Sequence, residues 1–271
     1  MCIGKKFSKT KYEGKTMKRI CIISDDKRYI TTRDLFLRNG YECEISSASS
    51  FHGADVVILS VKDELSDREL QTVFSLKNGV KAVFCGNGER IKNFYGGFIY
   101  DYSKDKSFVM KNAFLTAEAA RILTSQLTGE SFFGKRAFVI GYGRIGKFLC
   151  RELKNCGAAV YVWARRKESI SEAELAGAVF RDIESIAGDN YDFIYNTVPE
   201  IIIPGYLTDK VGGTTFAIEL ASSPGGFEDK SFAEKAPGLP GKILPVSAGR
   251  VVFDTVYGVL SDMASGKDET L

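Results

Sequence analysis

Short runs of apolar residues alternate along this chain with segments in which apolar residues recur every three or four positions. The first pattern predicts buried strands and the second predicts helices. In the first part of the chain, strands are expected at residues 19–24, 42–45, 55–61 and 81–85, and helices at 29–38 and 69–77. Apolar strands joined by helices are typical of a parallel sheet with both faces covered, which predicts an α/β domain over residues 17–111.

The same alternation returns after a helix. Thr116 can cap a helix over 116–127, with Glu118 in a first turn whose positive dipole end suits a carboxylate. We therefore expect a linker helix over 112–127 and a second domain over 128–245, with strands at 137–140, 158–163, 193–196 and 215–218. Helical spacing from Ser247 predicts that the last segment, 246–271, is a helix at the domain junction. The predicted fold class is α/β, with two doubly wound parallel-sheet domains and a C-terminal helix returning to the first.

A glycine motif identifies the second domain as a Rossmann dinucleotide-binding domain. Gly141, Gly143 and Gly146 follow a predicted strand at the spacing Gly-x-Gly-x-x-Gly, and a helical pattern and a further strand come after them. The first glycine allows a sharp turn, the second lets the backbone approach a pyrophosphate, and the third lets the helix pack closely on the sheet. N–H groups at the helix N-terminus then face the phosphates. The alternative is a glycine-rich turn that only packs well.

The residues after the second strand of this unit bear on the choice of nicotinamide cofactor. An NAD site usually has Asp or Glu there to hold the ribose 2′-hydroxyl, whereas this chain has Ala164, Arg165 and Arg166. Two guanidinium groups can pair with a 2′-phosphate, which favours NADP(H). The expected cofactor-binding residues are Gly141, Tyr142, Gly143, Arg144, Ile145, Gly146, Ala164, Arg165, Arg166, Thr197, Val198 and Pro199.

Composition excludes several classes of partner. The 271 residues are 44% hydrophobic and 26% charged, as in ordinary globular proteins. Residues 1–16 carry five lysines and one glutamate, a net charge of +4 out of a total of +3, so the remaining 255 residues sum to −1. We interpret residues 1–16 as a disordered leader, or as sequence upstream of an effective start at Met17. We expect no nucleic acid, and no apolar stretch approaches the roughly 20 residues of a membrane helix.

The cysteines and the histidine indicate a cytoplasmic protein without a metal site. None of the six cysteines forms a Cys-x-x-Cys pair, and several stand in or beside strand-like runs, as expected for buried reduced thiols. The only histidine, His52, cannot anchor a zinc site with such scattered cysteines.

Five motifs resemble, in order and at compatible spacing, the motif series of the dipicolinate synthase A-subunit family. They are NAFLTAEAAR (112–121), GYGRIG (141–146), NTVP (196–199), ELASSPGGFE (219–228) and PGLPGK (237–242) with SAGR (247–250). The resemblance implies an architecture akin to D-2-hydroxyacid dehydrogenases, and oxidation of dihydrodipicolinate to dipicolinate with NADP+ in the mother-cell cytoplasm during sporulation. It also implies that the flavoprotein-like B subunit of that enzyme is a partner, and we expect a homo-oligomer.

Such a substrate requires groups that hold two carboxylates, for which N–H groups, hydroxyls and cations are suited. A turn of small residues follows the strand that ends near Glu219, on the same sheet edge as Thr197. Asp26 and Arg28 match a Gly-Gly-Asp-x-Arg turn of the family, with Ser24-Asp25 replacing the glycines. The expected substrate-binding residues are Asn112, Thr116, Ser222, Ser223, Gly225, Gly226, Lys242 and Arg28.

The proton acceptor is expected to be Glu118 or Glu219. His52 is far in sequence from where D-2-hydroxyacid dehydrogenases place their base, which argues against 2-hydroxyacid oxidation. Two alternatives to a dipicolinate-forming enzyme stay open. One is another NADP(H)-dependent reductase of a small carboxylate, and the other is a non-catalytic NADP-binding subunit of a heteromeric complex, suggested by loop segments shorter than those of the family.

Overall fold

Five parallel strands form the first sheet of the computed structural model, which describes residues 17–62, 64–75 and 79–265. Its order is β2-β1-β3-β4-β5. The strands are β1 (Arg19–Ile23), β2 (Glu42–Ser46), β3 (Val56–Leu59), β4 (Ala82–Cys85) and β5 (Phe98–Asp101). Between them lie α1 (Arg28–Arg38), α2 (Asp67–Ser75) and α3 (Gly88–Ile91), with 3-10 turns η1 (Ala48–Ser50) and η2 (Tyr102–Lys104).

Both faces of this sheet are covered because successive side chains of a strand point to opposite sides. Ile20 of β1 packs with Phe36 of α1 on one face, whereas its neighbour Cys21 packs with Leu70 of α2 on the other. Burial in these cores raises the pKa of the Cys21 thiol to about 12.

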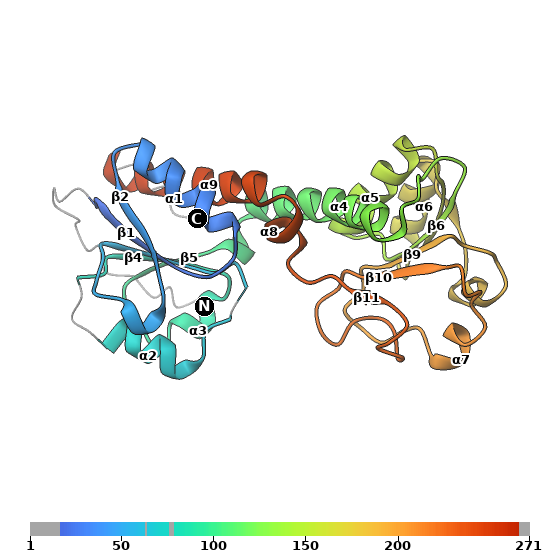
Figure 1. Ribbon diagram of the computed structural model, residues 1–271, viewed down its shortest axis with the longest axis horizontal. Helices are drawn as coiled ribbons and strands as arrows, with labels where there is room; N and C mark the ends of the chain where they lie inside the picture. The colour runs from blue at the N-terminus through green and yellow to red at the C-terminus, as the bar shows by residue number, and fades with distance from the viewer. Residues whose placement is uncertain (1–16, 63, 76–78, 266–271) are drawn as a thin grey trace, which may run out of the picture.

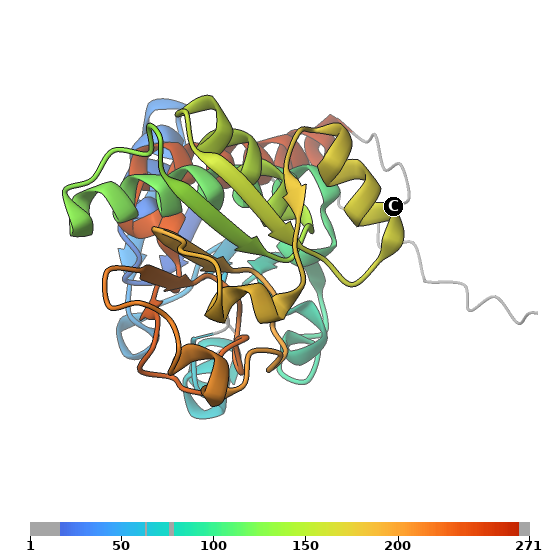
Figure 2. The same cartoon turned by 90° about the vertical axis from the view of Figure 1, so that its right-hand side faces the viewer.

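Six parallel strands form the second sheet, in the order β11-β10-β9-β6-β7-β8. Figure 2 looks onto this domain. The strands are β6 (Arg136–Ile140), β7 (Ala159–Trp163), β8 (Val179–Phe180), β9 (Phe193–Asn196), β10 (Phe216–Glu219) and β11 (Glu234–Lys235). The connections contain α5 (Arg144–Asn155), α6 (Lys167–Leu175), α7 (Gly205–Thr208) and the 3-10 segment η3 (Ile183–Ala187). The predicted class, two parallel-sheet α/β domains of which the second is Rossmann-like, is confirmed.

Each sheet has a point at which the strand order reverses. In the first sheet β1 lies between β2 and β3, and in the second β6 lies between β7 and β9. Loops leave the strands on either side of such a point toward opposite faces, so a crevice opens at the carboxyl ends and serves as the usual ligand site of open α/β sheets.

Two long helices lie at the junction of the domains, α4 (Lys106–Thr128) and α9 (Pro245–Ser265). In Figure 1 α4 extends from the first domain to the second, whereas α9 lies over the first domain beside α1. Phe108 of α4 belongs to the core of the first domain and Ala117 to that of the second. After β11 the short helix α8 (Leu239–Ile243) leads into α9, whose Val252 and Val256 pack in the core of the first domain.

The start of α4 corrects the sequence-based prediction. The helix begins at Lys106, capped by Asp105, whose carboxylate accepts the N–H of Phe108 at 3.0 Å. Thr116 therefore lies in the middle of the helix, and its hydroxyl donates to the carbonyl of Asn112 at 2.7 Å instead of capping. Glu118 consequently lies far from the first turn, where it would have met the helix dipole.

The predicted strands are all present to within two residues at either end, whereas β5, β8 and β11 were not predicted. Strand β5 is only half-buried, and β8 and β11 have two residues each. The end of the predicted helix 69–77 and the predicted leader 1–16 lie outside the described residues.

Candidate functional site

The glycine motif forms the turn between β6 and α5. Gly141 has a φ of +98°, and a Cβ there would lie 2.4 Å from the hydroxyl oxygen of Thr197. A Cβ on Gly146 would lie 2.0 Å from the carbonyl oxygen of Gly141, so only glycine lets α5 start so close to the strand. Gly143 differs, because a Cβ there would meet no other part of the described chain within 4 Å. This open side at the first turn of α5 fits a pyrophosphate.

The other motif residues divide by exposure. Tyr142 is buried in the core of the second domain and Ile145 is half-buried, whereas Arg144, the first residue of α5, is exposed. Only Arg144 of these three offers a side chain to a bound phosphate.

Hydrogen bonds hold the segment after β9 against the glycine turn. Thr197 donates its hydroxyl to the carbonyl of Ile140 at 2.9 Å. The buried side chain of Asn196 donates to the carbonyl of Val198 at 2.9 Å and accepts the N–H of Val198 at 3.1 Å. Thr197 and Val198 thus lie at the reversal point of the second sheet, beside Gly141, and Pro199 follows as an exposed residue.

Arg165 at the end of β7 does not stand free. It forms an ion pair of 2.5 Å with Glu200, which follows β9 on the other side of β6. Both side chains are about 60% exposed, 62% for Arg165 and 59% for Glu200. Ala164 is buried, and Arg166 is exposed at the start of α6 without a capping hydrogen bond. The Glu200 carboxylate thus lies beside the Ala164–Arg166 segment, which contains no carboxylate of its own.

Glu219 organises the turn of small residues after β10. Its carboxylate accepts hydrogen bonds from the Asn196 side chain (2.7 Å), the N–H of Ala221 (2.9 Å) and the N–H of Gly226 (2.8 Å). A Cβ on Gly225 would lie 2.6 Å from this carboxylate. With three donors on it, Glu219 is suited to shaping the turn and poorly suited to accepting a proton from a substrate.

A cavity of about 330 Å³ opens beside this turn. It is lined by Glu219, Ala221, Ser223, Pro224, Gly225, Phe227, Asp229, Lys230, Ala233, Lys235, Ala236 and Pro237. Ser223 and Gly225 are thus placed together as expected, whereas Ser222 and Gly226 do not line the cavity.

The three expected residues of α4 share one part of that helix. Asn112 and Glu118 are half-buried, and Thr116 is 8% exposed with its hydroxyl bound to the helix backbone. Glu118 has no hydrogen bond or ion pair with any described residue, so of the two expected proton acceptors it is the one with free oxygens.

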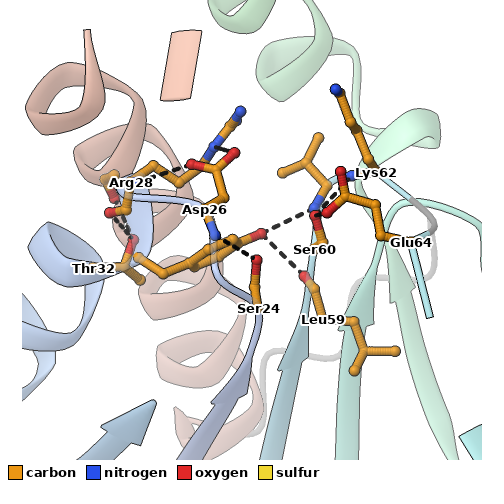
Figure 3. Close-up of polar contacts among 11 residues, drawn as sticks. Ser24, Asp26, Arg28, Thr32, Leu59, Ser60, Lys62 and Glu64 are labelled. Carbon is orange, nitrogen blue, oxygen red and sulfur yellow. Dashed lines mark hydrogen bonds and ion pairs between the residues drawn. The ribbon is translucent and has the colours of Figure 1, made fainter. Parts of the chain in front are cut away.

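Arg28 lies at the reversal point of the first sheet, as Figure 3 shows. Its side chain is 4% exposed, and its Nε donates to Asp26 Oδ2 at 3.0 Å while its backbone N–H donates to Asp26 Oδ1 at 2.9 Å. Lys242 of α8 is exposed, but the neighbouring Gly241 touches Asp26, since a Cβ there would lie 2.1 Å from Asp26 Oδ1. The expected residues Arg28 and Lys242 are therefore brought into one region.

Sequence reasoning missed Glu200 and Lys62. Glu200 follows the NTVP motif directly, so its position was visible but its pairing with Arg165 depends on the strand order. Lys62 follows β3, and its Nζ would lie 2.7 Å from a Cβ on Gly238. Its position beside the PGLPGK segment could not be predicted from the sequence around Lys62, because that segment is far away along the chain.

The described part of the chain holds no cluster of three or more potential metal-binding side chains. Within the same residues, no helix is both long and apolar enough to cross a membrane.

Comparisons with known proteins agree with this geometry. Residues 108–201 match the family described as D-isomer specific 2-hydroxyacid dehydrogenase, NAD binding domain. Among curated proteins, the dipicolinate synthase A subunit of Bacillus subtilis (strain 168) is 27% identical over 238 residues, which cover 79% of this chain and 80% of that protein. The chain is a relative of the dipicolinate synthase A subunit. The resemblance expected from the motifs is confirmed, and the family match indicates a nicotinamide dinucleotide cofactor and an oxidoreductase.

Solved structures support the same fold. The dipicolinate synthase A subunit from Bacillus halodurans has a TM-score of 0.73 at 22% identity, covering 90% of this chain and 98% of that chain. Salmonella D-lactate dehydrogenase has a TM-score of 0.62 at 15% identity, covering 89% and 95%. The fold is therefore shared by the dipicolinate synthase A subunit and by dehydrogenases of 2-hydroxyacids.

Proposed function

We propose that this protein oxidises dihydrodipicolinate to dipicolinate with hydride transfer to NADP+, together with a second subunit. The observation that carries the proposal is the open glycine turn at the reversal point of the second sheet, in a chain related to the dipicolinate synthase A subunit. The name of that relative describes one subunit of an enzyme, which supports a heteromeric complex.

The residues of the turn fit the pyrophosphate of a dinucleotide. Gly143 leaves its backbone open, and the first N–H groups of α5 are available there. Thr197 and Val198 hold the neighbouring strand end against Gly141, which keeps the crevice in one shape. When bound, the nicotinamide supplies a hydride acceptor at its C4 atom.

Arg165 and Arg166 support NADP(H) over NAD(H). Both are exposed at the end of β7, the second strand of the dinucleotide-binding unit, where Rossmann domains place the ribose 2′-phosphate of NADP. Guanidinium groups bind phosphate through two parallel hydrogen bonds. Because Glu200 already pairs with Arg165, a 2′-phosphate has to displace or share that carboxylate. Arg166 has no such competitor among the described residues.

The oxidation releases one hydride and one proton from the dihydropyridine ring, which becomes aromatic. We assign the proton to Glu118, because Glu219 is held by three donors while Glu118 is half-buried with free oxygens. Ser223 and Gly225 beside the cavity, with Asn112 at the junction, are proposed to contact the substrate carboxylates. His52 is exposed in the first domain, after η1, and takes no part in this scheme.

A reconstitution assay tests the proposal. The purified chain is mixed with dihydrodipicolinate and NADP+ or NAD+, with and without its partner protein, and the ultraviolet absorbance of dipicolinate and of reduced cofactor is followed. Equal amounts of both products with NADP+ are expected. Tight NADPH binding without dipicolinate under any condition supports the non-catalytic role, and turnover of simple 2-keto acids with NADPH supports the alternative reductase.

A further inference from the structure

A second polar site lies at the reversal point of the first sheet, away from the dinucleotide turn. The loop after β1 carries Asp26 and leads into Arg28, the first residue of α1, and the loop after β3 carries Ser60 and Lys62. These two loops lead into helices on opposite faces, since α1 packs in one core of the domain and α2 in the other. Carboxyl ends at such a point are the usual ligand site of an open parallel sheet.

Arg28 is held rigidly with two nitrogens unused. Only 4% of its side chain is exposed, and Asp26 accepts hydrogen bonds from its Nε and its backbone N–H. No hydrogen bond joins its Nη1 or Nη2 to any residue that the structure describes, and neither atom is enclosed as an orphaned buried group. A guanidinium that is buried yet keeps free donors is a ready partner for a carboxylate.

Lys62 supplies a second cation nearby. Its Nζ lies beside Gly238 and the Asp26 carboxylate lies beside Gly241, and these two glycines are three residues apart, about one helical turn at α8. In Figure 3 the Arg28 and Lys62 side chains end on the same side of the cluster. Lys62 is exposed and forms no ion pair within the described chain.

Hydrogen bonds fix the two segments that carry the cations, the start of α1 and the loop after β3, relative to each other. The buried hydroxyl of Tyr29 donates to the carbonyl of Leu59 at 3.1 Å and accepts the N–H of Val61 at 2.9 Å, which ties α1 to the loop after β3. The Glu64 carboxylate accepts a hydrogen bond from the Ser60 hydroxyl at 3.1 Å, and the Asp26 carboxylate forms an ion pair with Arg28. Both carboxylates of the cluster are thus engaged, while both cations keep free donors.

We infer that Arg28 and Lys62 form a subsite for one carboxylate of the substrate, so that the first domain holds one end of a small dicarboxylate. The inference rests on the proposed function and deepens it, because the second domain then needs to hold only the other carboxylate and the reacting ring. The segment after β11 touches both Asp26 and Lys62, so the subsite lies where the two domains meet.

Binding of dipicolinate and of pyridine-2-carboxylate to the full chain, measured by calorimetry, tests this inference. In the native protein the dicarboxylate is expected to bind more tightly, and Lys62→Gln should reduce its advantage over the monocarboxylate by about tenfold. Lys62→Arg should restore the advantage. Lys18→Gln, at the opposite end of β1, is the matched control and should change nothing.

Arg28→Gln should also reduce the affinity advantage of the dicarboxylate, and circular dichroism checks that this variant is folded. If it is not folded, the variants of the exposed Lys62 test the subsite on their own. NADPH affinity should stay unchanged throughout. If Lys62→Gln leaves the affinity advantage of the dicarboxylate over the monocarboxylate unchanged, the subsite is ruled out. If the native protein binds glutarate in a Lys62-dependent way but not dipicolinate, the subsite stands and the proposed substrate fails; binding of neither diacid overturns both.

Discussion

At the residue scale, the site depends on which glycines are needed for packing and which for a ligand. Gly146 has no room for a side chain, because a Cβ would lie 2.0 Å from a backbone oxygen, whereas Gly143 has open space. The same motif therefore contains one position that packing requires to be glycine and one that packing leaves open.

Substituting these two glycines should separate the roles. Gly146→Ala is expected to lower the free energy of unfolding by about 2–3 kcal/mol, because backbone has to shift to accept the methyl group. Gly143→Ala should change stability by about 0.5 kcal/mol or less, yet weaken dinucleotide binding about tenfold or more. Thermal denaturation and NADPH titration measure the two effects, and equal loss of stability in both variants would contradict the assignment.

The Arg165–Glu200 ion pair predicts an unusual response to charge removal. Glu200→Gln should tighten NADPH binding about two- to fivefold, because an exposed ion pair contributes at most about 1 kcal/mol and the phosphate no longer competes with a carboxylate. Arg165→Ala should weaken NADPH about tenfold. Affinity for NADH serves as the control, since it lacks the 2′-phosphate; weaker NADPH binding in Glu200→Gln would show that the carboxylate helps binding.

At the element scale, local pattern predicted the buried strands well. The strands β1, β3, β4, β6 and β9 are continuous apolar runs with nearly all residues buried, so their sequence reports their position directly. Both residues of strand β11 are exposed, and only its pairing with β10 distinguishes it as a strand. The glycine turn was predictable because its glycine spacing is also a local pattern. The positions of Lys62 and Glu200 in the site were not, because they depend on contacts between segments far apart in the sequence.

The long helix α4 shows how a start can be misplaced. Thr116 is a good capping residue by type, but Asp105 holds the cap and also accepts the hydroxyl of Tyr100 at 2.6 Å. Asp105→Ala should lower the free energy of unfolding by about 1–2 kcal/mol, because it removes the cap and the partner of Tyr100. Thr116→Ser, which keeps the hydroxyl in mid-helix, is the matched control. Chemical denaturation of both variants checks this, and a smaller loss for Asp105→Ala than for the control would refute the assigned cap.

At the scale of the whole molecule, buried thiols link stability to pH. Burial raises the pKa of Cys150, in α5, to about 12. The folded state thus favours the protonated thiol, and this contribution is complete below about pH 8.5, the value of an unfolded cysteine, and is lost as pH rises toward 12.

The free energy of unfolding should accordingly fall between pH 9 and 11, by up to about 1.4 kcal/mol per pH unit from this thiol. Cys150→Ala should show a shallower decline, although it is less stable at pH 7 because a methyl group fills less space. Urea denaturation at several pH values measures both slopes, with the half-buried Cys156→Ala as control. Parallel curves for native protein and Cys150→Ala would contradict the prediction.

The position of α9 has a consequence for how the chain is made. Val252, Val256 and Leu260 complete the core of the domain that is synthesised first, so the ribosome releases β1 to β5 long before the part of their cover that α9 supplies. Domains usually fold in the order of their synthesis. Here the apolar face around Ile20 and Phe84 has α1 beside it early but gains the contribution of α9 last, so the first domain completes its core only after the second domain has been synthesised.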